Sequence, residues 1–367
     1  MKLKYVLILI PFLVFNNLFA LNRSEVSNDS SHVHEQHVAG KFNPTEFIFD
    51  HIGDSFEWHV FTLNNHHYSI PLPVILYSKI YGFHIFLSSK FHNNNHTYKY
   101  FRLEKEGKYK GKIVELDSNG ELNEQNPLPL NFSITKNVFS ILLVCLLLCW
   151  IFISIARKYK THPHSAPTGV QNFFEPVILF VKNEIAKPSI GDRDHIRFMP
   201  FLLTIFFFIW FTNMLGLIPI FPGGANVTGN IAVTLGLALF TFIIVNINGN
   251  KHYWKDIINA PGVPWFLKFP IPIMPVVELS GIITKPFVLM VRLFANILAG
   301  HMVAIVFMSL IFIFGAIKFW LGYAAAPISI LFSVFMSALE LLVALIQAYV
   351  FTLLSAIYIG MAISEHH

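Results

Sequence analysis

The sequence predicts an all-α polytopic membrane protein with about five membrane helices, of which the last two are long, tilted and antiparallel. Hydrophobic residues make up 54% of the 367 residues and charged residues only 13%. A typical soluble domain carries about 25% charged residues. The apolar residues form membrane-length runs from residue 138 onward, whereas residues 22–137 are polar. We therefore expect a signal peptide (1–20), a periplasmic extension (21–137) and a membrane domain (138–367).

The amino terminus has the features of a secretory signal peptide. Two lysines precede a short apolar run, and the small residue Ala20 follows it. An uncleaved first membrane span is the alternative, but the run is short and Pro11 interrupts it. Cleavage near Ala20 would place the new amino terminus outside the cytoplasm.

The extension is expected to be partly disordered and to contain short β-strands. Residues 24–40 are polar and rich in histidine, a composition typical of disorder. Beyond residue 47, aromatic and β-branched segments separated by asparagine and glycine predict a small antiparallel β unit. The segments are 56–61, 68–70 and 75–77. The histidines of this region show no repeated ligand spacing, so we expect them to be solvated or packed rather than bound to a metal.

Three membrane spans are expected before the long final pair. Residues 138–156 form the first span, and the basic run Arg157-Lys158-Tyr159-Lys160 after it indicates a cytoplasmic end. Apolar residues then recur at helical spacing over residues 170–185, which predicts an amphipathic helix on the membrane surface. Residues 198–220 and 231–247 are the second and third spans, and the connector between them has no lysine or arginine, as expected outside the cytoplasm.

The last two elements are too long to be upright spans. They cover about residues 276–315 and 327–363, with a break at residues 320–327. Each has roughly 35–40 residues, whereas about 20 residues cross a bilayer at 1.5 Å per residue. We therefore expect both helices to be tilted or bent. The preceding loop, residues 251–275, holds five prolines, which we expect to exclude regular helix.

One face of the first long element carries three charged side chains. Glu278, Lys285 and Arg292 are spaced seven residues apart, so they share a helix face. Lys285 is close enough to the start of the helix to extend toward the membrane surface. Arg292 lies two turns deeper, where a guanidinium costs ~2.5–3.5 kcal/mol on insertion scales. Because this chain offers it no evident counter-charge, we expect a carboxylate on another chain.

The two long elements also carry polar residues at matching depths. In an antiparallel pair, residues at one depth have nearly constant index sums, which places His301 opposite Glu340 and Arg292 opposite Gln347. An imidazole facing a carboxylate within lipid satisfies both groups, and it can also relay protons because histidine titrates near neutral pH. The alternative is an ion-pair network that only holds the two helices together.

Four stretches of the sequence resemble subunit a of F-type ATP synthases. They are ELSGIITKPFVLMVRLFANILAGH at residues 278–301, NMLGLIP at 213–219, ANVTGNIAVTLGLAL at 225–239, and LIQAYVFTLLSAIYIGMAISEHH at 345–367. The resemblance covers roughly residues 173–367. The signal peptide and the GDSFEWHVF stretch resemble the Bacteroidetes version of this subunit.

The resemblance implies a proton-channel (stator) subunit that works beside a rotating ring of subunit c, with subunit b of the stator stalk and other ATP synthase subunits as further partners. Arg292 matches the essential arginine that faces the carboxylates of the ring. The polar residues of an outer half-channel are matched by Asn296, His301, Glu340 and Gln347. The carboxylate of the cytoplasmic half-channel is matched by Glu278. The implied location is the bacterial inner membrane, with a periplasmic amino terminus and a cytoplasmic carboxyl terminus.

The chain itself is expected to be non-catalytic and to need no cofactor or metal. No GxxxxGK[ST] phosphate-binding loop occurs in it, so ATP chemistry would take place elsewhere in a complex. The formal charge of +5 is explained by basic residues beside membrane spans, and no nucleic-acid-binding module is present. A stand-alone ion channel or a secondary transporter is the alternative function; the latter predicts internal repeats, which are not evident. An intramembrane protease would need a Ser/His, paired-Asp or HExxH constellation, which we do not find. Proton is favoured over sodium, because an imidazole is a poor sodium ligand.

Overall fold

The computed structural model describes residues 53–63, 66–92, 96–104, 107–117, 120–123, 128–161, 166–218, 221–258 and 273–364. The expected signal peptide, its cleavage site near Ala20 and the histidine-rich residues 24–40 lie outside these ranges. Within them, the predicted fold class is confirmed. Five helices are long and apolar enough to cross a membrane, and short strands precede them.

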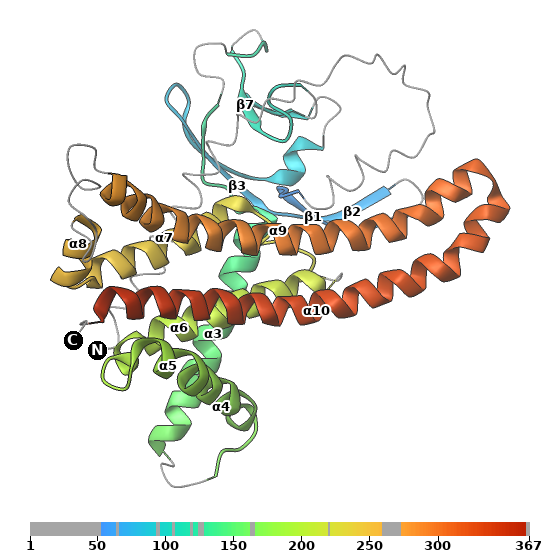
Figure 1. Ribbon diagram of the computed structural model, residues 1–367. Helices are drawn as coiled ribbons and strands as arrows, with labels where there is room; N and C mark the ends of the chain where they lie inside the picture. Colours follow the sequence, from blue (N-terminus) through green and yellow to red (C-terminus); the bar gives the residue numbers. More distant parts are fainter. Residues whose placement is uncertain are drawn as a thin grey trace. The chain divides into compact units, whose positions relative to one another are not determined.

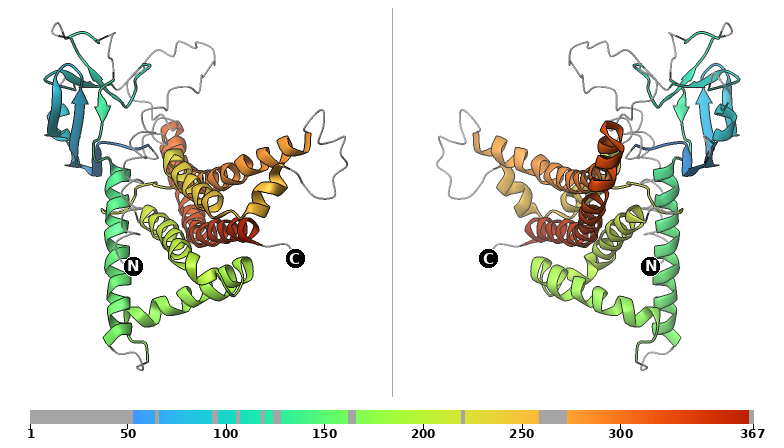
Figure 2. Two further views of the ribbon diagram at one scale, coloured as in Figure 1. Left: turned by 90° about the vertical axis from the view of Figure 1, so that its left-hand side faces the viewer. Right: turned by 90° about the vertical axis from the view of Figure 1, so that its right-hand side faces the viewer.

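The extension contains the β unit that the sequence predicts. Eight strands are present among its described residues: β1 (Glu57–Leu63), β2 (His66–Pro71), β3 (Pro73–Ser78), β4 (Gly82–Leu87), β5 (Thr97–Tyr98), β6 (Phe101–Leu103), β7 (Ile113–Glu115) and β8 (Leu130–Asn131). They form one two-stranded sheet, β1-β2, and two three-stranded sheets, β4-β3-β8 and β5-β6-β7. All pairings are antiparallel, and Figure 2 draws these strands at the amino-terminal end of α3.

The extension has its own hydrophobic core. Buried residues alternate along β3, so Val74 and Leu76 face inward, where they meet Phe86 of β4. Phe91 follows in the short 3₁₀ helix η1 (Ser88–Phe91), and Phe101 is wholly buried. Because these side chains come from four segments between residues 74 and 101, their packing fixes the small sheets against one another.

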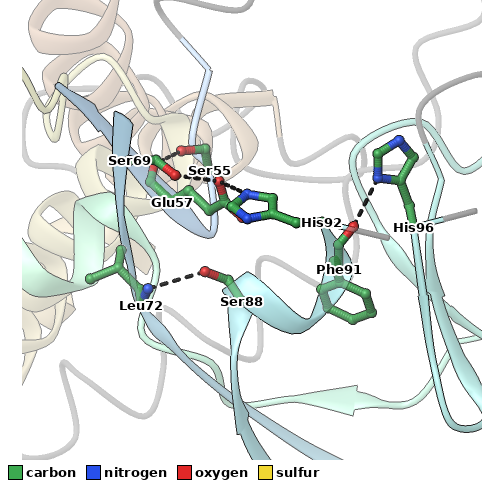
Figure 3. Close-up of polar contacts among 8 residues, drawn as sticks. All are labelled: Ser55, Glu57, Ser69, Leu72, Ser88, Phe91, His92 and His96. Carbon is green, nitrogen blue, oxygen red and sulfur yellow. Dashed lines mark hydrogen bonds and ion pairs between the residues drawn. The ribbon is translucent and has the colours of Figure 1, made fainter. Parts of the chain in front are cut away.

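Polar contacts tie β1 to the remainder of the extension (Figure 3). The Ser69 hydroxyl on β2 donates to Glu57 Oε2 over 2.9 Å, and His92 Nε2 lies 2.9 Å from the same oxygen. Leu72, which follows β2, and Ser88 are joined twice: the Leu72 N–H donates to Ser88 Oγ, and the Ser88 N–H donates to the Leu72 carbonyl. Glu57 is therefore the point at which β1, β2 and the residue after η1 meet.

The first three membrane helices are α3 (Lys136–Thr161), α6 (His195–Leu217) and α7 (Ile231–Asn248). Helix α3 begins two residues before the expected start of the first span. Helix α7 begins after Asn230, whose side chain accepts a hydrogen bond from the Ala232 N–H and so caps the helix. The predicted spans and the helices thus agree to within a few residues.

The predicted amphipathic helix is present but is not continuous. It consists of α4 (Val170–Phe180), the π-helical segment η2 (Val181–Ala186) and α5 (Lys187–Ile190). Phe174, Val181 and Ile185 are buried as expected, whereas Phe173 is 63% exposed. Phe173 lies before the π segment and is adjacent to the buried Phe174, and successive residues of a helix are turned by about 100°, so the two rings cannot both face inward.

The expectation of a non-helical loop over residues 251–275 is wrong at both of its ends. Residues 251–258 form α8 (Lys251–Ile258), and Pro275 lies in the first turn of α9 (Ile273–Ile317). A proline is tolerated in the first turn because that N–H has no partner within the helix. The final helix is α10 (Phe319–Ile363), so α9 and α10 have 45 residues each and a single residue, Lys318, separates them. The expected break at residues 320–327 is therefore wrong, because these residues belong to the first turns of α10.

Candidate functional site

The candidate site lies on the hairpin formed by α9 and α10 (Figure 1). Near the turn, a Cβ added to Gly322 would lie only 2.8 Å from the Gly315 Cα, so the two backbones approach closely there. Further along, Phe307 stacks on Phe332 with 5.3 Å between the ring centroids. These pairs have index sums of 637 and 639, close to the sums used to pair the polar residues. The antiparallel register expected from the sequence is therefore present.

His301 and Glu340 form the expected pair across this hairpin. His301 Nδ1 lies 3.0 Å from Glu340 Oε1, and the two side chains are 18% and 5% exposed. The carboxylate packs directly against Gly300, because a Cβ added at this position would be in ordinary van der Waals contact with Glu340 Oε1, at 3.4 Å. A buried carboxylate needs such a partner, since an isolated charge in a low-dielectric environment is strongly unfavourable. The arrangement can hold a proton or a charge pair inside the helix bundle.

Arg292 lies in a different environment from that pair. Its side chain is exposed on α9, and so are those of Ala295, Asn296 and Ala299, which follow at helical spacing. The next residue, Leu293, is turned by about 100° around the helix and is 1% exposed. Among the residues that the structure describes, no carboxylate lies within ion-pair distance of Arg292. The guanidinium therefore faces outward from this chain beside small side chains that would let another helix approach closely.

Gln347 is buried at 6% exposure on α10. No hydrogen bond or ion pair joins it to Arg292 within the described part of the chain, although the index sum places both at one depth. Equal depth does not require contact, because the two side chains can leave their helices in different directions. The hairpin thus brings His301 and Glu340 together, and it leaves Arg292 and Asn296 on an outer face.

Glu278 and Lys285 belong to a cluster near the start of α9. Lys285 Nζ lies 5.5 Å from the centroid of the Tyr358 ring, a cation–π geometry that the sequence did not indicate. Burial raises the pKa of Tyr253, and the negative charge of the nearby Glu278 raises it further. A small cavity with room for about one water molecule is lined in part by Tyr253, Lys285 and Tyr358.

A buried polar pair was also missed. Asn213, at the end of α6, accepts a hydrogen bond from the Thr228 hydroxyl, and both side chains are at most 4% exposed. The Asn213 Nδ2 group is buried without a hydrogen-bond partner. Both residues lie within NMLGLIP and NVTGN, which were noted only as parts of a resemblance, and no local pattern showed that the two stretches meet.

Within the described ranges, no cluster of three or more His, Cys, Asp or Glu side chains is placed to hold a metal ion. The histidines of the extension that can be placed have other contacts. His84 packs edge-on against Phe101 with 5.3 Å between the centroids. His96 Nδ1 lies 2.9 Å from the Phe91 carbonyl oxygen.

Residues 138–360, more than half of the chain, match the family described as ATP synthase A chain. Residues 47–133 match a second family, described as a domain of unknown function (DUF8433). The chain is 42% identical over 244 residues to ATP synthase subunit a of Chloroherpeton thalassium, covering 64% of this chain and 68% of the relative.

Two further relatives are also named as ATP synthase a subunits. ATP synthase subunit a 2 of Chlorobaculum tepidum is 44% identical over 238 residues, which are 63% of this chain and 64% of that protein. ATP synthase subunit a of Myxococcus xanthus is 42% identical over 243 residues, or 65% and 75% of the two chains. With five helices that could span a membrane and a family match that covers three of them fully and nearly all of the other two, this multi-pass membrane protein belongs to the ATP synthase subunit a family.

Proposed function

We propose that this chain is the proton-conducting stator subunit of an F-type ATP synthase. Two offset half-channels in it deliver protons to, and remove them from, carboxylates on a rotating ring of subunit c. Proton flow is thereby coupled to ATP synthesis elsewhere in the complex. The chain itself is a non-catalytic component.

The exposed, unpaired Arg292 is the observation that carries this proposal. A guanidinium stays protonated at any physiological pH, so it can attract a carboxylate but cannot pass a proton on. Arg292 has no carboxylate partner among the described residues and lies beside exposed small residues on a membrane-length helix. A carboxylate carried by a neighbouring ring would supply the missing charge, and Arg292 would separate the two half-channels.

The outer half-channel is assigned to Asn296, His301, Glu340 and Gln347. The His301–Glu340 pair supports this assignment, because it is the one histidine–carboxylate pair within the described membrane helices. An imidazole and a carboxylate 3.0 Å apart can exchange a proton and rotate to new partners. Asn296 lies one helical turn from Arg292, where its amide can hydrogen-bond a water molecule that passes the proton to the ring.

The cytoplasmic half-channel is assigned to Glu278. It lies two helical turns from Lys285 and four from Arg292, toward the start of α9, and it is partly buried near Tyr253. The cavity at Lys285 and Tyr358 lies along α9 between Glu278 and Arg292, and it has room for about one water molecule. A proton that leaves the ring could follow this route to the membrane surface.

The organisation of the whole chain is proposed to follow from this role. Residues 1–20 would be a signal peptide, residues 21–137 a periplasmic extension and residues 138–367 the membrane domain in a bacterial inner membrane. The carboxyl terminus would be cytoplasmic. Subunit c, subunit b and the other ATP synthase subunits would be its partners.

A stand-alone channel or secondary transporter is the competing function. It would conduct ions without partners, whereas the proposed stator requires a ring. Copurification of this chain with a small hairpin subunit that carries one membrane carboxylate favours the stator. Ion flux through the purified chain alone, at the rate seen in the complex, favours the channel.

The decisive variant is Arg292→Ala. We expect ATP-driven proton pumping into inverted vesicles to be lost, because the ring carboxylate would have no fixed charge to meet. Pumping is followed by quenching of a pH-sensitive dye. Lys318→Ala is the matched control, since it also removes an exposed cation from the hairpin but lies at its turn, outside both assigned half-channels, and we expect it to retain most pumping. Coupled pumping by Arg292→Ala would refute the proposal.

A further inference from the structure

Trp58 of the extension is buried among residues that are distant in the sequence. Only 3% of it is exposed. Its ring packs edge-on against Phe139 of α3, with 5.7 Å between centroids, and against Phe221 of the α6–α7 connector, with 5.3 Å. The two phenylalanine rings lie 5.9 Å apart, so the three rings form a closed triangle. Aromatic pairs of this geometry stabilise a fold beyond the area that they bury.

The residues just before β1 also bind the first turn of α3. The Lys136 N–H donates to the Ser55 carbonyl over 3.0 Å, and the Asn137 N–H donates to Asp54 Oδ1 over 3.1 Å. The first N–H groups of a helix have no partner within the helix and need caps. Here the extension supplies two of these caps from about 80 residues away in the sequence. Lys136 Nζ also lies 5.7 Å from the centroid of the Trp58 ring.

The same strand is held on its other side by the extension. Neighbouring residues of a strand point to opposite faces, so Glu57 and Trp58 face in opposite directions. The Glu57 carboxylate makes polar contacts with Ser69 and His92 (Figure 3), whereas the Trp58 ring packs against Phe139 and Phe221. Glu57 thus anchors β1 within the extension, and Trp58 joins β1 to two segments of the membrane domain.

Phe221 opens a connector whose backbone is tightly folded. A Cβ at Gly223 would lie 2.2 Å from the Ile218 carbonyl oxygen, so only glycine fits there. The Gly224 N–H donates to the Leu215 carbonyl over 3.1 Å. By sequence, this connector joins the helix end that carries Asn213 to the residue Thr228 that binds it.

We propose that the extension holds the α6–α7 connector against the first turn of α3 through Trp58, which packs on Phe139 and Phe221. We call this three-ring contact the clamp. It positions the connector for proton transfer. Trp58 is a positioning residue, because it acts through Phe139 and Phe221. The consequence for proton transfer rests on the proposed function, whereas the clamp itself does not.

Hydrogen exchange in the intact complex tests the clamp directly. In Trp58→Ala we expect the amides of Phe221, Gly223 and Gly224 and of residues 136–139 to exchange about tenfold faster, because the aromatic contacts that oppose local opening are lost. Trp58→Phe should restore much of the protection. Phe83→Ala is the matched control: Phe83 lies in the same extension but is 61% exposed, and we expect no change in either segment.

A reciprocal variant separates loss of the clamp from unfolding of the extension. Phe221→Ala lies outside the extension and leaves the core around Phe101 intact. It should accelerate exchange in the same two segments, and the Trp58→Ala/Phe221→Ala double variant should be no worse than the more severe single variant. Unchanged exchange in both single variants, or fully additive effects, would overturn the clamp.

Proton pumping tests the consequence. We expect Trp58→Ala to lower the ratio of proton pumping to ATP hydrolysis several-fold, and Trp58→Phe to recover it. Faster exchange with an unchanged ratio would overturn the role in proton transfer. If Arg292→Ala retained coupled pumping, the proposed function would fail, but the exchange measurement would still decide whether the clamp exists.

Discussion

Glu340 and Arg292 are held in opposite ways by the same hairpin. Glu340 is buried and lies 3.0 Å from an imidazole nitrogen, which compensates its charge within the chain when the imidazole is protonated. Arg292 is exposed and has no carboxylate partner among the described residues. The first arrangement is paired within the chain, and our proposal completes the second with a carboxylate on a neighbouring subunit.

The His301–Glu340 pair leads to a prediction about exchanged side chains. Glu340→Gln and His301→Glu should each reduce proton flux at least tenfold, because removal of one partner leaves the other buried and uncompensated. The double variant His301→Glu/Glu340→His keeps one acid and one imidazole at this depth, and it should recover most of the flux. Passive proton uptake by vesicles, driven by a potassium gradient, measures this.

The swap also separates the relay from a purely structural pair. Both single variants must reach the membrane in normal amounts, which immunoblotting checks. Wild-type flux in Glu340→Gln would show that the pair only holds the helices together. Failure of the double variant to exceed either single variant would count against a shared proton site.

Part of the site could be predicted at this scale, and part could not. Helical periodicity and an antiparallel register place His301 opposite Glu340, because both follow from residue number alone. The packing of the Glu340 carboxylate against Gly300 depends on the distance between two helix axes, which residue numbers do not contain. The contact between Trp58 and Phe221 joins residues 163 positions apart, and no local pattern encodes such a pairing.

At the scale of elements, the prolines show where sequence rules hold and where context overrides them. Pro275 lies in the first turn of α9, as the rules allow. Pro286 and Pro327 lie inside α9 and α10, where each removes one backbone donor. In a membrane helix, neighbouring helices and local adjustments compensate for this loss, so proline ends helices less reliably there.

Close packing of α10 on α5 gives a prediction about stability. A Cβ at Gly360 would lie 1.9 Å from the Ser189 carbonyl oxygen, which is backbone and cannot turn aside. Gly360→Ala should therefore destabilise the membrane domain by about 1–3 kcal/mol, the usual cost of overpacking. Gly281→Ala on α9 is the control, because no atom lies within 4 Å of its added Cβ. Thermal unfolding of the purified protein in detergent compares the two variants, and equal midpoints would contradict this packing.

At the scale of the whole molecule, the extension has a hydrophobic core that contains no residue of the membrane helices. Phe101→Ala should cost about 3–5 kcal/mol within this core, because Phe101 is fully buried. Proteolysis should then cleave the extension faster while the helices remain resistant. Phe83→Ala, at an exposed site, should leave cleavage unchanged. Equal resistance of Phe101→Ala and the wild type would argue against this core.

The large-scale organisation was the most predictable part of the chain. Spans that must satisfy their backbone in lipid have strong apolar signatures, and all five are found close to where hydropathy places them. Strands β5 to β8 have only two or three residues each, so their pairing depends on tertiary contacts that the sequence does not display.

The single residue between α9 and α10 has a consequence for changes in chain length. Because only Lys318 lies between the two helices, the hairpin has no loop that could accommodate an extra residue. One inserted residue in either arm would move everything beyond it by 1.5 Å and turn it by 100°, which would separate His301 from Glu340. The length of the segment from residue 302 to residue 339 is therefore fixed by the pair that it brings together, and an insertion in either arm should abolish proton flux through that pair.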